Sequence, residues 1–71
     1  MKKSNVQAKI NALPIGQEFD VKTLMGSDWN GVRGKQSFGR EFKESVRNGS
    51  LQNVRHVRLD NSPRRDVYIK I

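Results

Sequence analysis

The side chains best suited to binding chemistry in this sequence are basic and recur at helical spacing between residues 35 and 48. Arg40, Lys43 and Arg47 are three and four residues apart, which places like charges beside one another on one helix face. Each such pair destabilises an isolated helix by about 0.2–0.5 kcal/mol, so the stripe favours a polyanionic ligand. Gln36 and Ser37 precede the stripe and add side chains that can hydrogen-bond to DNA base edges. A fully solvated helix face is the alternative interpretation.

Two further cations stand where this helix is expected to begin. Arg33 and Lys35 lie near the positive end of the helix dipole, where positive side chains are unfavourable. The free backbone N–H groups of a first helical turn bind anions, and a phosphate would relieve the conflict. The sequence therefore predicts a phosphate contact here. The alternative is that both cations are exposed and screened by solvent.

A third basic group lies in the C-terminal part of the chain, around the turn formers between Asp60 and Arg65. Arg64 and Arg65 are expected at the tip of a β-hairpin, where they could reach a minor groove or a phosphate. A turn that only improves solubility is the alternative. The wet face of the same hairpin is expected to carry His56, Arg58, Tyr68 and Lys70. Tyr68 could stack on a base there or simply cover Arg58 across the strands.

Composition supports a polyanionic partner and argues against catalysis. The 71 residues hold 14 Lys and Arg against 7 Asp and Glu, a formal charge of +7. Ten of the cations and only four of the acids lie between residues 33 and 71. With one histidine, no cysteine and scattered acids, the chain offers no catalytic group, no thiolate metal site and no sign of a cofactor. We therefore expect a cytoplasmic protein that is not an enzyme.

The rest of the sequence predicts the elements that position these cations. Ser4 and Gln7 have the spacing of a capping box, and a helix is expected over about 5–13, after a flexible segment at 1–3. A brief strand around Phe19 follows, and then a short helix that Asp20 or a neighbour caps. Trp29 is expected to be a core residue. No apolar run is long enough to cross a membrane.

The longest helix is predicted over 35–48, because Phe38, Phe42 and Val46 recur every four residues. Gly49 should end it, with Leu51 folding back onto it. Gly39 lies inside this helix, where glycine costs about 1 kcal/mol relative to alanine. We expect it to permit close approach by the preceding short helix.

From residue 54 the apolar period changes to two, which predicts an antiparallel hairpin with one buried face. The alternation assigns to that buried face Val57, Leu59, Val67, Ile69 and Ile71. The expected fold class is therefore α+β, in a single domain over residues 4–71.

The order helix, short strand, short helix, longer helix and hairpin resembles the winged helix-turn-helix family over residues 5–71. The chain is also similar to a family of short uncharacterised proteins of bacteria and their plasmids and phages, through the run Trp29-Asn30-Gly31, Phe38-Gly39-Arg40-Glu41-Phe42, Val46 and Gly49. The winged-helix resemblance implies that the third helix enters the major groove of duplex DNA. It also implies that the hairpin, or wing, lies on the backbone or in the minor groove.

On this interpretation the protein binds double-stranded DNA and regulates, or is accessory to, a bacterial or mobile-element function. The expected contacts to the major groove are Gln36, Ser37, Arg40, Lys43 and Arg47. The expected contacts to phosphate or from the wing are Arg33, Lys35, Arg58, Arg64 and Arg65. Two alternatives remain: a protein-interaction module that docks on an acidic partner, and a binder of RNA or single-stranded DNA.

Overall fold

The computed structural model describes residues 2–61 and 64–71 of the chain. Its elements follow one another as α1 (Lys3–Asn11), β1 (Glu18–Phe19), α2 (Val21–Met25), the 3₁₀ helix η1 (Gly26–Gly31), α3 (Lys35–Arg47), β2 (Val54–Asn61) and β3 (Arg64–Lys70). Apart from η1, which the sequence did not predict, this is the predicted order, and the α+β class is confirmed. The arrangement is that of a small winged-helix-like domain.

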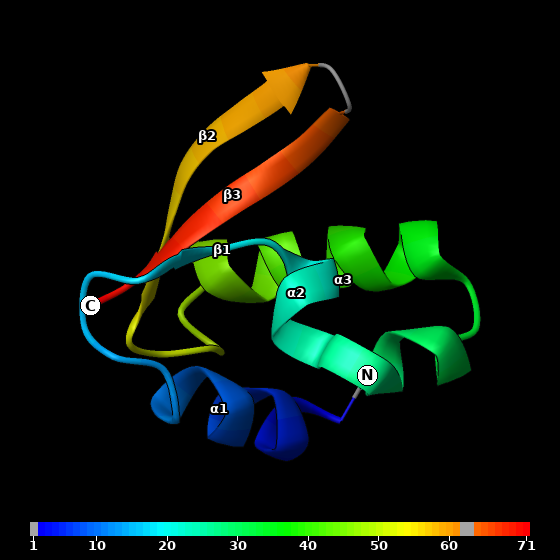
Figure 1. The fold of residues 1–71 in the computed structure, drawn as a ribbon, viewed down its shortest axis with the longest axis horizontal. Coiled ribbons are helices and arrows are strands. Elements are labelled where there is room, and N and C mark those ends of the chain that lie inside the picture. The colour runs from blue at the N-terminus through cyan, green and yellow to red at the C-terminus, as the bar shows by residue number, and fades with distance from the viewer. Residues whose placement is uncertain (1, 62–63) are drawn as a thin grey trace.

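The sheet has three antiparallel strands in the order β1-β3-β2. β1 is so short that it pairs only with Ile69 and Tyr68 of β3. The outer half of the β2–β3 hairpin therefore projects beyond β1, with α3 running beneath it and α1 on the far side of the molecule (Figure 1). This arrangement brings the start of β3 over the exposed side of α3.

The core forms where α1, α2 and α3 meet the inner face of the sheet. Phe42 and Tyr68 are both fully buried, and their rings meet edge to face with centroids 4.8 Å apart. Phe38 packs against Trp29, which is partly buried at the edge of the core. Leu51 is buried and its N–H donates to the Ser45 carbonyl, so the chain does fold back onto α3. Gly49 has φ +83° just past the end of α3, as predicted for a helix-ending glycine.

The first helix begins earlier than its capping-box spacing predicts. It starts at Lys3, and its N-cap residue Lys2 has no side-chain hydrogen bond. The side chain of Gln7 instead bonds both backbone groups of Gln52, with its amide at 2.9 Å from the carbonyl and its oxygen at 2.8 Å from the N–H. A long-range contact therefore uses the side chain that the local pattern assigned to capping.

The predicted buried face of the hairpin is correct for Val67, which is 3% exposed, and wrong for Val57, Leu59 and Ile71. Val57 and Leu59 are 39% and 40% exposed, and Ile71 is also exposed, while Tyr68 is at 0%. An irregularity in the pairing between His56 and Arg58 shifts the register, so the alternation along β2 does not continue unchanged. The inner face instead carries Tyr68, because its ring fills the space between Phe42 and Phe19.

The same change removes the expected aromatic group from the wet face. Tyr68 cannot stack on a base from the surface of the hairpin, and Lys70 is buried beside it. The expected turn at 60–65 is also shorter, because Asp60, Asn61, Arg64 and Arg65 all belong to strands. The remaining turn residues, 62 and 63, lie outside the described part of the chain.

Candidate nucleic-acid interface

A groove of about 620 Å³ lies between α3 and the start of β3. Its walls carry five of the predicted contact cations: Lys35, Arg40, Lys43, Arg64 and Arg65. Gln36 and Gly39 complete the helix side, and Asp66 is the single acid in the lining. Two segments separated by about 25 positions in the sequence therefore combine into one strongly positive concave surface.

The helix side of this groove is a regular stripe. At 100° per residue, Gln36, Arg40, Lys43 and Arg47 fall within about 60° of one another. Arg40 and Arg47 are exposed, and Lys43 is partly exposed. Ser37 is exposed at the edge of the stripe, and neither it nor Arg47 lines the groove. Within residues 2–61 and 64–71, no acidic side chain pairs with Arg40 or Arg47.

The beginning of α3 has no side-chain cap. Gly34 occupies the N-cap position with φ +63° and contributes no capping hydrogen bond. Arg33 and Lys35 are exposed on either side of it, and the Lys35 ammonium lies 5.9 Å from the centroid of the Trp29 ring. Arg33 lies outside the groove, while Lys35 lines it. Positive side chains and uncapped N–H groups thus occur together here, as the sequence predicts.

One acid connects the helix stripe to the hairpin. Asp66 Oδ1 lies 3.3 Å from Nζ of Lys43 and 2.9 Å from Nε2 of His56. The His56 ring also packs edge to face on Tyr68, with centroids 5.3 Å apart. Asp66 therefore holds β3 against α3 and orients Lys43 along the groove wall.

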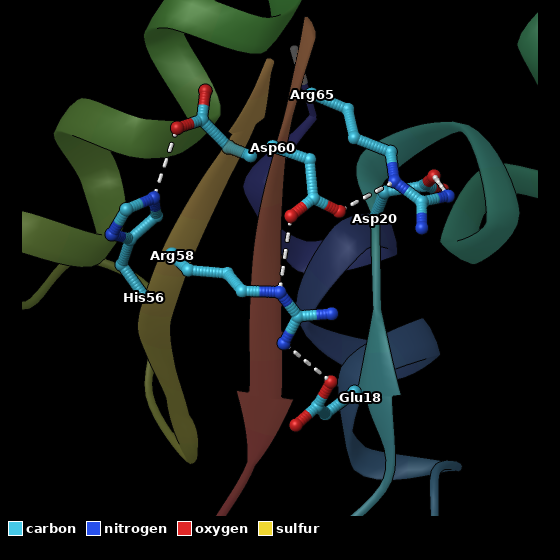
Figure 2. A network of polar contacts seen from close by, with 7 residues as sticks. Glu18, Asp20, His56, Arg58, Asp60 and Arg65 are labelled. Carbon is cyan, nitrogen blue, oxygen red and sulfur yellow. Dashed lines mark hydrogen bonds and ion pairs between the residues drawn. The ribbon is translucent and has the colours of Figure 1, made fainter. Parts of the chain in front are cut away.

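The other face of the hairpin carries an ion-pair network that sequence reasoning missed (Figure 2). Arg58 Nη1 donates to Glu18 at 2.8 Å, and Arg58 Nε donates to Asp60 at 3.1 Å. The hydrogen bond with Glu18, followed by the one with Asp60, raises the pKa of Arg58 above its ordinary value. Arg58 is not part of the groove lining, so the structure does not group it with the other predicted contacts.

Arg65 belongs to both surfaces. It lines the groove, yet its guanidinium donates to Asp20 at 3.2 Å and to Asp60 at 3.3 Å. Arg64, by contrast, is exposed and forms no ion pair within the described residues. At the start of β3, Arg64 is thus the cation that is immediately accessible to a ligand.

Asp20 is the acid that ties this network to the helices. Its Oδ1 accepts the Thr23 N–H at 2.7 Å and caps α2, as predicted. Burial raises the pKa of this carboxyl, but the hydrogen bonds from Thr23 and the charge of Arg65 outweigh burial and lower the pKa overall. Ionised Asp20 is therefore stabilised by folding.

This depressed pKa gives a testable pH dependence. A carboxyl with a lowered folded-state pKa contributes stability above its unfolded value, about 3.9, and loses it as the pH falls through the folded value. Asp20→Asn keeps a good cap and should flatten the fall in melting temperature below about pH 4. Asp20→Ala also removes the cap, so we expect it to cost about 1 kcal/mol at pH 7. Thermal melts at several pH values check both, and equal slopes for wild type and Asp20→Asn would contradict the assignment.

The acids of this network could not be found from local patterns. Glu18 and Asp20 flank Phe19, and that alternation predicted the strand. Their partners lie about 40 and 45 positions away, and only the pairing of β1 with β3 brings them close.

No cluster of three or more metal-ligating side chains occurs among residues 2–61 and 64–71. In the same part of the chain, no helix has the length and apolar character that a membrane span needs.

Comparison with known proteins assigns a family but no activity. Residues 4–70 match the family model described as "Domain of unknown function (DUF1413)". The match covers nearly the whole chain, and the protein belongs to this family. No curated protein and no solved structure matches it.

Proposed function

We propose that this DUF1413 protein binds double-stranded DNA through the groove between α3 and the start of β3. The observation that supports the proposal is the convergence of Lys35, Arg40, Lys43, Arg64 and Arg65 on one concave surface. Neutralising phosphates with Lys and Arg supplies most of the affinity of proteins for nucleic acid, because counterions are released. A chain with a net charge of +7 is suited to that role.

The geometry of α3 suggests how contacts divide between bases and phosphates. Its 13 residues span about 20 Å, and a major groove about 12 Å wide accepts a helix. The exposed stripe would then meet base edges, in the manner that the winged-helix resemblance implies. The residues proposed for base contact are Gln36, Ser37, Arg40, Lys43 and Arg47.

Phosphate contact is proposed for Arg33, Lys35, Arg64 and Arg65. Arg65 must exchange its carboxylate partners for phosphate, but partly exposed ion pairs are worth only about 0–1 kcal/mol, so the exchange is inexpensive. Arg58 is left out of the main contacts, because it is paired on the other face of the hairpin. A regulatory or accessory role at a bacterial or mobile DNA element, in the cytoplasm, is the biological setting that we propose.

Titration of ¹⁵N-labelled protein with a random duplex of about 16 base pairs tests this function. Amide signals of the groove residues, including Gln36, Arg40 and Arg64, should shift, while those near Lys9 on α1 should not. The variants Arg64→Glu and Arg55→Glu provide a matched pair: each reverses one exposed arginine of the hairpin that forms no ion pair within the described residues, and only Arg64 lines the groove, so only the first should abolish the shifts. Absence of any shift at about 50 mM salt, where phosphate contacts are strong, would overturn the proposal.

A protein-interaction module is the second candidate, and one observation favours it. β2 is an edge strand, because the order of the sheet is β1-β3-β2. Val57 and Leu59 are exposed along it, and an exposed sheet edge can accept an extended segment of another protein. Val57→Lys should abolish such binding and leave DNA binding intact.

A further inference from the structure

We propose that a second cavity, next to the positive groove, binds a single nucleotide. The base would enter the cavity, and the phosphate would contact the cations at the rim of the cavity. This inference rests on the proposed function for the source of the nucleotide, and it goes beyond it by assigning a base-binding pocket. The cavity has a volume of about 480 Å³, within the range of roughly 300–1,000 Å³ that small-molecule sites occupy.

The cavity and the groove are neighbours around the start of the hairpin. Gly39, Arg64, Arg65 and Asp66 line both of them. The second cavity is otherwise walled by Tyr68 and by the start of α2 and η1, through Val21, Lys22 and Trp29. Asp20 also lines it, and its carboxylate is paired with Arg65. A strand whose phosphates follow the groove would thus pass directly beside the cavity.

Gly39 is the first residue that points to an occupant. Glycine in the interior of a helix is less favourable than alanine, so its presence calls for a reason. The expected reason, close approach by the preceding short helix, is wrong: a Cβ built on Gly39 would meet nothing within 4 Å. No neighbouring group of the protein therefore requires glycine at this position. A ligand that passes between the groove and the cavity would require it, because a side chain would occupy the space that the ligand needs.

Tyr68 is the second residue that points to an occupant of the cavity. It is fully buried and lines the cavity, but its hydroxyl oxygen has no hydrogen-bond partner within the described residues. Burial, with a smaller contribution from Asp66, raises the pKa of this hydroxyl, so it stays protonated and able to donate. Buried polar groups are nearly always hydrogen-bonded. A carbonyl or ring nitrogen on the edge of a base would supply the missing acceptor after a small opening of the wall.

The remaining lining fits the other parts of a nucleotide. The partly buried Trp29 provides aromatic surface, on which bases stack without regard to sequence. Lys22 and Arg64 are exposed at the rim and form no ion pair within the described residues, so both can meet a phosphate. Apolar wall, orphaned hydroxyl and free cations together match a planar base that carries a phosphate.

The test compares two duplexes that differ by one base. The first is fully paired, and the second carries a single bulged 2-aminopurine, whose fluorescence reports stacking. We expect the bulged duplex to bind roughly tenfold more tightly, within the range that one base–aromatic stack contributes, with a change in 2-aminopurine emission. Tyr68→Phe, at a residue that lines the cavity but not the groove, should remove this preference and leave the affinity for the paired duplex unchanged. Gly39→Ala should also remove the preference.

Controls separate the pocket from the fold and from the proposed function. Both variants should melt at or above the wild-type temperature, since one adds helix propensity and the other removes an unsatisfied hydroxyl. Gly31→Ala, at another glycine with open space around it, should keep the preference. A titration with AMP distinguishes the sources: shifts at Gly39 and Tyr68 would support the pocket with a free nucleotide as its occupant.

The outcomes are distinct. Equal affinity for both duplexes, together with no response to AMP, would overturn the pocket while leaving duplex binding intact. Loss of all duplex binding with a retained AMP response would overturn the proposed function instead. A preference for the bulge that survives in both Gly39→Ala and Tyr68→Phe would also overturn the pocket.

Discussion

Replacement of Phe42 by alanine is expected to unfold the protein. Replacing a buried phenylalanine by alanine lowers the free energy of unfolding by about 3–5 kcal/mol, because the transfer free energy of the ring is lost and a cavity remains. Phe42 is 0% exposed and its ring contacts that of Tyr68, which is the centre of the inner sheet face. A domain of this size has only about 4–10 kcal/mol of stability in total, on a scale of 0.05–0.15 kcal/mol per residue. One substitution therefore removes a large part of it.

Thermal and urea melts followed by circular dichroism measure this effect. Ile15→Ala is the matched control, since Ile15 is 81% exposed and its truncation should change the melting temperature little. Duplex binding should disappear with the fold in Phe42→Ala and persist in Ile15→Ala. A cooperative, near-native melt of Phe42→Ala would mean that the core does not depend on α3 in the way described.

The helical part of the fold was predictable because its signals are local. Phe38 and Phe42 mark the buried side of α3 through their spacing alone, and Gly49 ends the helix through its own backbone freedom. The cation stripe of α3 follows from the same periodicity, since it must lie opposite the buried side. No long-range contact is needed for any of these inferences.

The hairpin was harder because a strand can bury either of its faces. Alternation in β3 offers Val67 and Ile69 on one side and Tyr68 on the other, and the sequence pattern alone favours the aliphatic side. The structure places Tyr68 inward, where its ring packs between those of Phe19 and Phe42, and it also buries Val67, the preceding residue, at 3% exposure. The register irregularity after His56 has no sequence signal as clear as a glycine.

The candidate site divides in the same way. The cations were all recognisable from sequence, because charge and spacing are local properties. The sequence does not reveal which of these cations are paired with acids. Asp20 reaches Arg65, and Asp66 reaches Lys43, only through tertiary packing. We therefore propose a ranking of the wing cations in which Arg64 comes before Arg65 and Arg58 is left out, because its carboxylate partners hold it on the other face of the hairpin.

That ranking leads to a quantitative prediction on salt. If the four cations proposed for phosphate contact neutralise phosphates, the logarithm of the association constant should fall with the logarithm of salt concentration at a slope of about −3.6, at about −0.9 per contact. Arg64→Gln should weaken all duplexes alike and flatten this slope by about one unit. Arg58→Gln removes an arginine from the same hairpin but from the paired outer face, and should leave the slope unchanged.

Arg40 should behave differently, because it is proposed to contact bases rather than phosphates. Arg40→Gln should cost about 1–3 kcal/mol on a preferred site, found beforehand by selection from random duplexes, and much less on random DNA. Fluorescence anisotropy at four or more salt concentrations gives all the constants that are needed. If Arg64→Gln and Arg58→Gln flatten the slope equally, Arg58 contacts phosphate despite its ion pairs with Glu18 and Asp60. If Arg40→Gln weakens every duplex to the same extent, the stripe on α3 binds phosphate, and recognition is independent of sequence.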